Sequence, residues 1–189
     1  MKVKNYFVGI LWVSIIGISN LASGEDLSPR SSMAGDIYPI LNKLYPNTDV
    51  KIVTKVDKNN CEITGNQPGM IMADFNGDGK SDYAVLAQLR RVKGNRTNKD
   101  EDFDGVAITL LALMQTASGA FKKVILEKIK GNWVGNVFID LEAPGILHET
   151  QTSKAVRLKT PSVALVYCGK SQVDFYWDGR GFKQVWISD

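Results

Sequence analysis

The chain has 189 residues, with 23 Lys and Arg against 20 Asp and Glu, a formal net charge of +3 and 44% hydrophobic residues. That length is enough for one domain with its own core, and the composition excludes a disordered chain, a collagen-like chain and a polytopic membrane protein. The small net charge also argues against a dedicated nucleic-acid binder.

The N-terminus has the pattern of a secretory signal. A basic start, Met1–Lys4, precedes an apolar run from Tyr6 to Ile18, which is shorter than the roughly 20 residues of a membrane-spanning helix. Ala22 and Gly24 fit a signal-peptidase cut after Gly24. We therefore expect residues 1–24 to be a cleaved signal peptide, which predicts a secreted or periplasmic protein with no membrane segment after cleavage. The alternative is an uncleaved N-terminal anchor.

One short helix is expected near the start of the mature chain. Residues 25–35 read as a polar leader, and apolar residues then recur at spacings of three and four from Asp36 to Tyr45. Pro39 suits the first turn of such a helix, and Pro46 follows its last turn. Residues 36–189 are expected to form a single β-rich domain.

Everything after Asp49 reads as strands and turns. The expected strands are 51–56, 70–73, 83–89, 106–114, 121–126, 134–141, 162–167, 172–177 and 182–187. Short strands at this spacing predict a mainly β (α+β) fold, an antiparallel sheet with one short N-terminal helix.

The two cysteines of the chain, Cys61 and Cys168, are far apart in sequence. An oxidising compartment would let them pair, and closing so long a loop stabilises by roughly 4–5 kcal/mol on the chain-entropy model. A nucleophilic or metal-binding thiol has no supporting motif, because there is no CxxC and His148 is the sole histidine. A structural disulfide is therefore expected.

An Asp-rich loop carries the strongest chemical signal. With Asp74 as position one, oxygen-bearing side chains fall at positions one, three, five and nine, and position seven offers a backbone carbonyl; these five residues are Asp74, Asn76, Asp78, Asp82 and Lys80. Five oxygen donors in nine residues suit Ca²⁺. Gly77 and Gly79 allow so short a loop to turn its oxygens inward.

The loop differs from an EF-hand and from a P-loop. An EF-hand needs Glu at position twelve, where the chain has Val85, and a P-loop needs Gly where the chain has Asp74. Magnesium is disfavoured because it prefers few protein ligands and several waters. A metal-free turn between two strands remains the alternative to a calcium loop.

The segment from Ala73 to Leu86 resembles the calcium-binding repeat of FG-GAP and VCBS proteins, the type found in integrin α-subunit β-propellers. The resemblance implies that the five loop residues hold calcium in a strand-loop-strand hairpin, and that the sheet consists of propeller-blade-like hairpins. Further along, the turn Gly119–Phe121 is similar to the Gly-x-Phe turn that follows in such repeats.

Length limits this resemblance. A seven-bladed propeller at roughly 40 residues per blade is longer than the chain. A second acidic loop, with Asp100, Asp102, Asp104 and Gly105, repeats the first positions of the motif but has Ile108 at position nine. The sequence leaves open whether that loop binds metal.

Aromatic residues gather in the last hairpin around a turn at 178–181; they are Phe175, Tyr176, Trp177, Phe182 and Trp186. Neighbouring residues of a strand face opposite sides, so Tyr176 cannot share a face with Trp177. One set is expected in the core, and the other is available as a surface platform for a glycan or peptide.

No catalytic motif accompanies these features. His148 stands beside Glu149, and the chain has neither an HExxH nor a GxSxG motif. The sequence therefore predicts a secreted module with structural Ca²⁺ that binds an extracytoplasmic protein or glycan. The alternative is a secreted hydrolase with a calcium-stabilised β fold. Nothing in the sequence indicates an oligomeric state.

Overall fold

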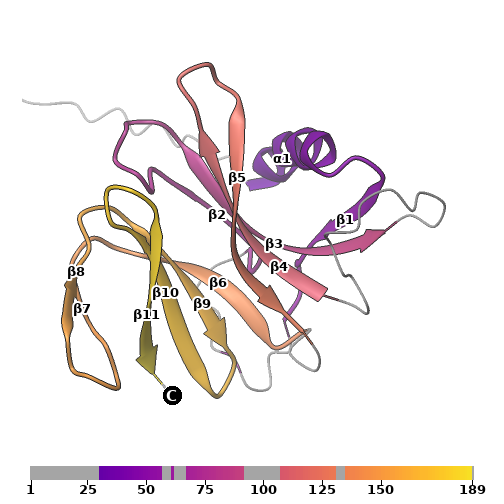
Figure 1. Ribbon diagram of the computed structural model, residues 1–189. Coiled ribbons are helices and arrows are strands. Elements are labelled where there is room, and N and C mark those ends of the chain that lie inside the picture. The colour runs from indigo at the N-terminus through magenta and orange to yellow at the C-terminus, as the bar shows by residue number, and fades with distance from the viewer. Residues whose placement is uncertain (1–29, 57–60, 62–66, 92–106, 131–134, 189) are drawn as a thin grey trace, which may run out of the picture.

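Two antiparallel sheets packed face to face make up most of the structure, a computed structural model that describes residues 30–56, 61, 67–91, 107–130 and 135–188 (Figure 1). The elements are α1 (Arg30–Leu44), β1 (Thr48–Ile52), β2 (Met70–Ala73), β3 (Asp82–Arg91), β4 (Ala107–Gln115), β5 (Phe121–Ile129), β6 (Val137–Glu142), β7 (Ile146–His148), β8 (Ala155–Arg157), β9 (Ser162–Tyr167), β10 (Ser171–Trp177) and β11 (Phe182–Ser188). The expected mainly β fold with one N-terminal helix is confirmed.

The first sheet has the strand order β1-β3-β4-β5, and β2 also pairs with β3. Both β1 and β2 pair with β3, β1 along Ala87–Arg91 and β2 along Asp82–Val85. Consecutive residues Ala84–Ala87 of β3 and Leu110–Met114 of β4 are buried. Their unbroken apolar sequence is explained by burial of both faces of the sheet, rather than of one.

The second sheet has the order β11-β10-β9-β6. Its inward residues meet those of the first sheet in one core; the largest contributors include Phe75, Leu86, Leu110, Leu165 and Phe175. At one side the two sheets are joined directly, since the N–H of Ile139 on β6 donates to the carbonyl of Pro68, just before β2, at 2.8 Å. Among the described residues, these strands form a two-sheet sandwich and no closed propeller.

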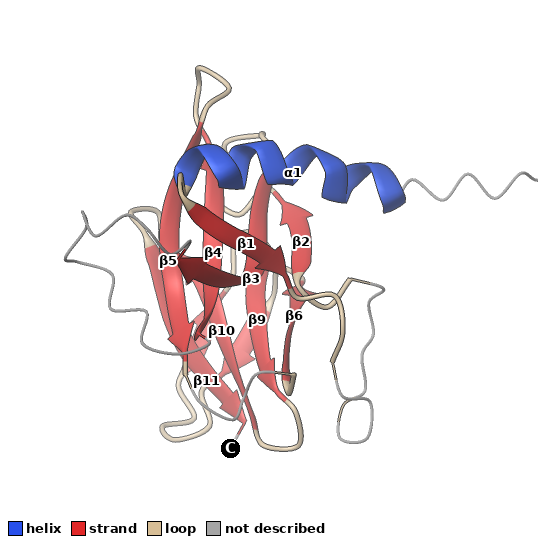
Figure 2. Ribbon diagram, turned by 90° about the vertical axis from the view of Figure 1, so that its right-hand side faces the viewer, coloured by secondary structure: helices blue, strands red, loops and turns tan. Residues whose placement is uncertain are grey.

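The helix covers the outer face of the first sheet and crosses its strands (Figure 2). Buried Ile37, Leu41 and Tyr45 pack against sheet residues that include Leu111 and Leu113. The helix begins at Arg30 rather than at Asp36, so Pro39 lies inside it and not in its first turn. Packing of the residues on either side of Pro39 outweighs the hydrogen bond that proline cannot donate.

Two short strands were not predicted from the sequence. β7 and β8 form a hairpin that lies beyond the second sheet in Figure 1, and its turn returns to that sheet, where the N–H of Thr150 donates to the carbonyl of Trp186 at 2.9 Å. Strands of three residues are too short to show a period of two.

The signal peptide expected at 1–24, the start of the polar leader at 25–29 and the acidic loop at 100–105 lie outside the described residues. Within the described part, no helix combines the length and apolar character needed to cross a membrane.

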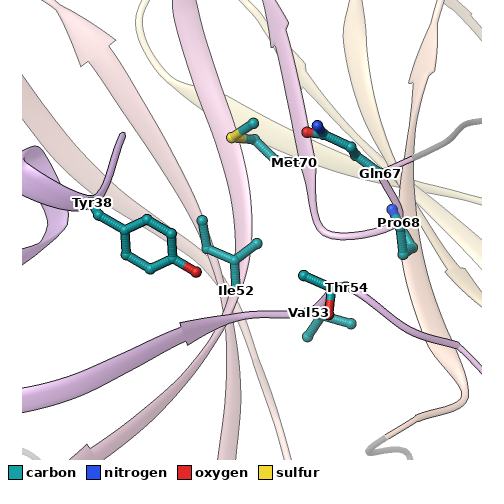
Figure 3. A pocket seen from close by; sticks show the side chains of 7 residues that line it. All are labelled: Tyr38, Ile52, Val53, Thr54, Gln67, Pro68 and Met70. Carbon is teal, nitrogen blue, oxygen red and sulfur yellow. The ribbon is translucent and has the colours of Figure 1, made fainter. Parts of the chain in front are cut away.

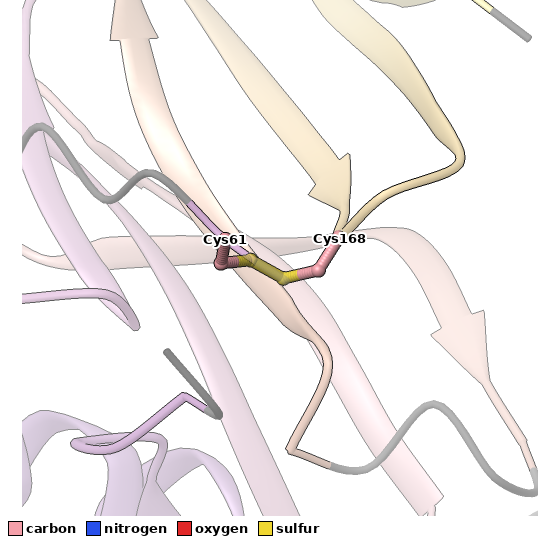
Figure 4. Close-up of a disulfide and its surroundings, with 2 residues drawn as sticks. All are labelled: Cys61 and Cys168. Atoms are coloured by element: carbon pink, nitrogen blue, oxygen red, sulfur yellow. A yellow bond between two sulfur atoms is a disulfide. The ribbon is translucent and has the colours of Figure 1, made fainter. Parts of the chain in front are cut away.

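The expected disulfide between Cys61 and Cys168 is present (Figure 4). The two Cα atoms are 5.0 Å apart, within the normal range for a disulfide. Cys168 follows β9, so the bond ties the segment before β2 to the second sheet. A disulfide is consistent with an extracytoplasmic location.

Removing this bond should weaken the fold. We expect the variant with both Cys61→Ser and Cys168→Ser to lose about 2–5 kcal/mol of unfolding free energy, because the unfolded chain gains conformational freedom. Guanidinium unfolding with and without a reductant measures the loss. The double variant is its own control, since reductant should not change it. If wild-type protein that is unfolded and refolded with reductant has the same unfolding free energy as without it, the prediction is wrong.

One carboxylate is buried on the outward face of the second sheet. Asp174 is fully buried; it accepts hydrogen bonds from Gln172 Nε2 at 2.8 Å and from the Ser162 hydroxyl at 3.3 Å. Burial raises the pKa of Asp174, the negative charge of Glu142 adds to the rise, and the two hydrogen bonds oppose it. The folded protein therefore keeps this proton to a higher pH than the unfolded chain does.

Stability should depend on pH through this group. Since the native state binds the proton more tightly, the contribution of Asp174 to the unfolding free energy falls as pH rises from about 3.8 through the folded pKa. An Asp174→Asn variant keeps an acceptor for Gln172 and a donor for Ser162. Its unfolding free energy minus that of wild type should therefore grow between about pH 4 and pH 7.

Chemical denaturation at several pH values measures this difference. Asp49→Asn, at an exposed position on β1, is the matched control and should change stability by less than about 0.5 kcal/mol. A pH-independent difference for Asp174→Asn would show that burial does not disfavour its charge.

Candidate functional site

The Asp-rich loop joins two neighbouring strands of the first sheet. β2 ends at Ala73 and β3 begins at Asp82, and these two residues are paired across the antiparallel ladder. The loop is therefore a strand-loop-strand hairpin. Gly77 and Gly79 have φ of 78° and 81°, the left-handed conformation that glycine adopts most easily.

Side-chain oxygens organise the backbone of the loop. Asp74 Oδ1 accepts from the N–H groups of Gly77 at 2.7 Å and Asp78 at 3.1 Å, and its Oδ2 accepts from that of Gly79 at 2.7 Å. Asn76 Oδ1 accepts from the N–H of Asp78 at 2.9 Å. The chain thus winds around the first carboxylate; both lone pairs of Asp74 Oδ1 are engaged, whereas Asp74 Oδ2 and Asn76 Oδ1 each retain a further one.

Asp82 is the buried member of the set. It has no exposed surface, and its two oxygens accept from the N–H of Phe75 at 3.1 Å and from the N–H of Gln115, at the end of β4, at 2.8 Å. Burial raises its pKa; the two N–H donors oppose that rise, and the charges of Asp78 and Asp74 add to it. The loop therefore holds a desolvated carboxylate close to two others.

Lys80 is paired with the most exposed carboxylate. Its Nζ lies 3.1 Å from Asp78 Oδ2, and this contact keeps the pKa of Asp78 below its usual value. The loop thus contains three carboxylates and one ammonium group, and that ammonium group contacts Asp78. In this arrangement, within the described part of the chain, no three His, Cys, Asp or Glu side chains converge as a metal site.

The loop is fixed to both sheets. Phe75 is fully buried in the core and meets Phe182 of β11 edge to face, with ring centroids 6.5 Å apart. The hydroxyl of Thr160, just before β9, donates to the carbonyl of Phe75 at 2.7 Å. A Cβ at Gly77 would lie 3.2 Å from the Thr160 methyl group, so the loop and this segment are in close contact.

A groove of about 530 Å³ lies beside the loop. Its lining comes from Asn76 and Gly77 of the loop, from the segment 154–160 and from the end of β10 with its turn. Of the aromatic residues in the last hairpin, Phe175 is buried in the core. Tyr176 and Trp177 point to opposite faces of β10, and both border the groove, half-buried, because it lies at the end of that strand. The contribution of residues 154–160 could not be foreseen from the sequence, because it depends on the unpredicted β7–β8 hairpin.

A second hollow, of about 150 Å³, lies between α1, β1 and the start of β2 (Figure 3). Its walls are mainly apolar, with Tyr38, Ile52, Val53, Pro68 and Met70, and the side chains of Thr54 and Gln67 also border it. At this size it is smaller than the typical pocket of a cofactor or drug-sized ligand, about 300–1,000 Å³.

His148 lies exposed on β7 and does not line the groove. Among the described residues that do line it, Asp178 is the one carboxylate. A pair of carboxylates, which a glycosidase requires, is therefore missing from the described lining.

Comparison of the chain with known proteins identifies no similar protein. No family model matches the chain, and neither a curated protein nor a solved structure matches it. The likeness to FG-GAP and VCBS repeats therefore remains a prediction based on the loop and its hairpin.

The buried carboxylate should matter more for stability than the exposed one. In Asp82→Asn, one of the two backbone donors would face an amide NH₂ group and stay unsatisfied, which we expect to cost about 1–3 kcal/mol. Asp78→Asn is the matched control in the same loop and should change stability much less than Asp82→Asn does, because its side chain is exposed. Urea unfolding in the presence of a chelator compares the two without any contribution from metal. Equal stability of the two variants would contradict the anchoring role of Asp82.

Proposed function

We propose that the protein is an extracytoplasmic binding module whose Asp74–Asp82 loop holds a structural Ca²⁺ ion. The ligands would be the side chains of Asp74, Asn76, Asp78 and Asp82 with the carbonyl of Lys80. The observation that carries this proposal is an excess of negative charge, three carboxylates against one ammonium group, in a tightly wound loop with a buried Asp82.

The electrostatics of the loop favour a divalent cation. Asp82 is buried beside Asp74 and Asp78, and the one ammonium group in the loop contacts Asp78 alone. Burial is the main cause of the raised pKa of Asp82, and Ca²⁺ would offset both this loss of solvation and the smaller repulsion from Asp78 and Asp74. It would also require Asp78 to exchange the Lys80 ammonium for the ion.

The donor set favours calcium over other metals. All five donors are oxygens, with no thiolate or imidazole among them, which suits a hard cation. A loop that supplies five protein oxygens matches the coordination number of Ca²⁺ better than that of Mg²⁺, which keeps most of its waters.

Binding, rather than hydrolysis, is the function that the groove supports. The described lining has cationic and aromatic residues but a single carboxylate. The disulfide and the N-terminal signal pattern support export of the chain. The partner would be an extracytoplasmic protein or glycan.

Calcium should stabilise the protein measurably. For a Kd of about 0.1–1 mM, typical of extracellular modules, about 10 mM CaCl₂ adds about 1.4–2.7 kcal/mol. That corresponds to a rise in Tm of about 3–10 °C for a chain of this size. Differential scanning calorimetry with CaCl₂, MgCl₂ or EGTA measures the shift.

Variants locate the effect. Asp78→Ala should lose most of the calcium-dependent shift while still folding in EGTA, because its side chain is exposed. Asp49→Ala, an exposed aspartate outside the loop, should keep the full shift. If calcium leaves the wild-type Tm unchanged, or shifts Asp78→Ala equally, the loop is a metal-free turn.

A further inference from the structure

Three cationic side chains line the groove beside the loop, and each lacks an anionic partner among the described residues. They are Lys154, Arg157 and Lys159, from β8 and the residues next to it. Lys154, Arg157 and Lys159 are all exposed. Arg157 and Lys159 also line another hollow, of about 420 Å³, next to the groove.

The carboxylate of the described lining does not neutralise this charge. Asp178 Oδ1 accepts from the N–H groups of Arg180 at 2.8 Å and Gly181 at 2.9 Å, which lower its pKa. Its Oδ2 lies 3.9 Å from the Nζ of Lys183. Asp178 therefore bonds within its own turn and to Lys183, and the described lining of the groove keeps a net positive charge.

Aromatic surface adjoins the cations. Tyr176 and Trp177, at the end of β10, both line the groove. The ring of Trp177 is held edge to face against Phe182, with centroids 5.4 Å apart. An ordered ring costs little further entropy when a ligand stacks on it.

This combination selects a class of ligand. Sugar rings present apolar C–H faces that stack on aromatic rings, and carboxylates on those sugars pair with Arg and Lys. A stretch of acidic residues would satisfy the cations, but it carries no ring whose apolar face could stack on Trp177. The volume of about 530 Å³ falls within the range of small-ligand sites.

We propose that this groove binds an acidic oligosaccharide, with Arg157 and Lys159 pairing with its carboxylates and the ordered ring of Trp177 stacking on one of its sugar rings. The proposal deepens the proposed function and rests on it for the glycan partner. Asn76 and Gly77 of the loop form one wall of the groove, and Thr160 joins that wall to the cationic segment.

Titration calorimetry of the full mature chain in CaCl₂ tests the proposal. The probes are oligomers of galacturonate, mannuronate and glucuronate, neutral oligosaccharides of the same length, and a poly-glutamate peptide. We expect at least one oligouronide to bind, the neutral sugars to bind about tenfold more weakly, and affinity to fall as salt rises from about 50 to 300 mM.

Arg157→Ala and Lys159→Ala should each weaken binding by about tenfold, and both positions are exposed, so the variants should fold. Trp177→Ala should also weaken binding, with its Tm checked because the ring packs on Phe182. Lys122→Ala, an exposed cation on β5 of the other sheet, is the matched control and should bind as wild type does.

The proposal is overturned if no oligouronide binds, if only poly-glutamate binds, or if Arg157→Ala and Lys159→Ala bind as wild type does. A parallel Tm measurement with CaCl₂ and EGTA separates the two proposals. If the wild-type protein shows the calcium shift but binds no oligouronide, only the proposal for the groove is wrong. If it binds an oligouronide but calcium does not shift its Tm, only the proposed calcium site is wrong.

Discussion

The buried carboxylate of Asp82 is the interaction on which the arrangement of the loop depends. A charged group is tolerated in the core only if its oxygens are bonded, and here the N–H groups of Phe75 and Gln115 provide those bonds. One donor belongs to the start of the loop and the other to the end of β4. Asp82 therefore closes the loop at its base and fastens it to the neighbouring strand at the same time.

This anchoring places the loop between the two sheets. Phe75 enters the shared core, and its carbonyl accepts a hydrogen bond from the hydroxyl of Thr160, in the segment that leads into β9. The cations of β8 and the aromatic end of β10 lie around the same point. A change in the loop would therefore reach the groove through direct contacts, without any long-range rearrangement.

Much of this arrangement follows from the sequence, and the exceptions have physical reasons. The hairpin around Asp74–Asp82, the disulfide and strands such as β9 were predicted because turn residues, cysteines and apolar runs leave local signatures. The burial of Asp82 and its bond to Gln115 were not, because they depend on the pairing of β3 with β4. The groove was missed as well, since Arg157 and Tyr176 meet only after the β7–β8 hairpin returns to the second sheet.

The two-sheet arrangement buries both faces of the loop-bearing sheet within one short chain. In this protein α1 covers one face of the first sheet and the second sheet covers the other. Leu111 and Leu113 of β4 contact the helix side, while Leu110 and Ala112 face the second sheet. The helix on one side and the second sheet on the other therefore supply the burial that holds the loop-bearing hairpin in place.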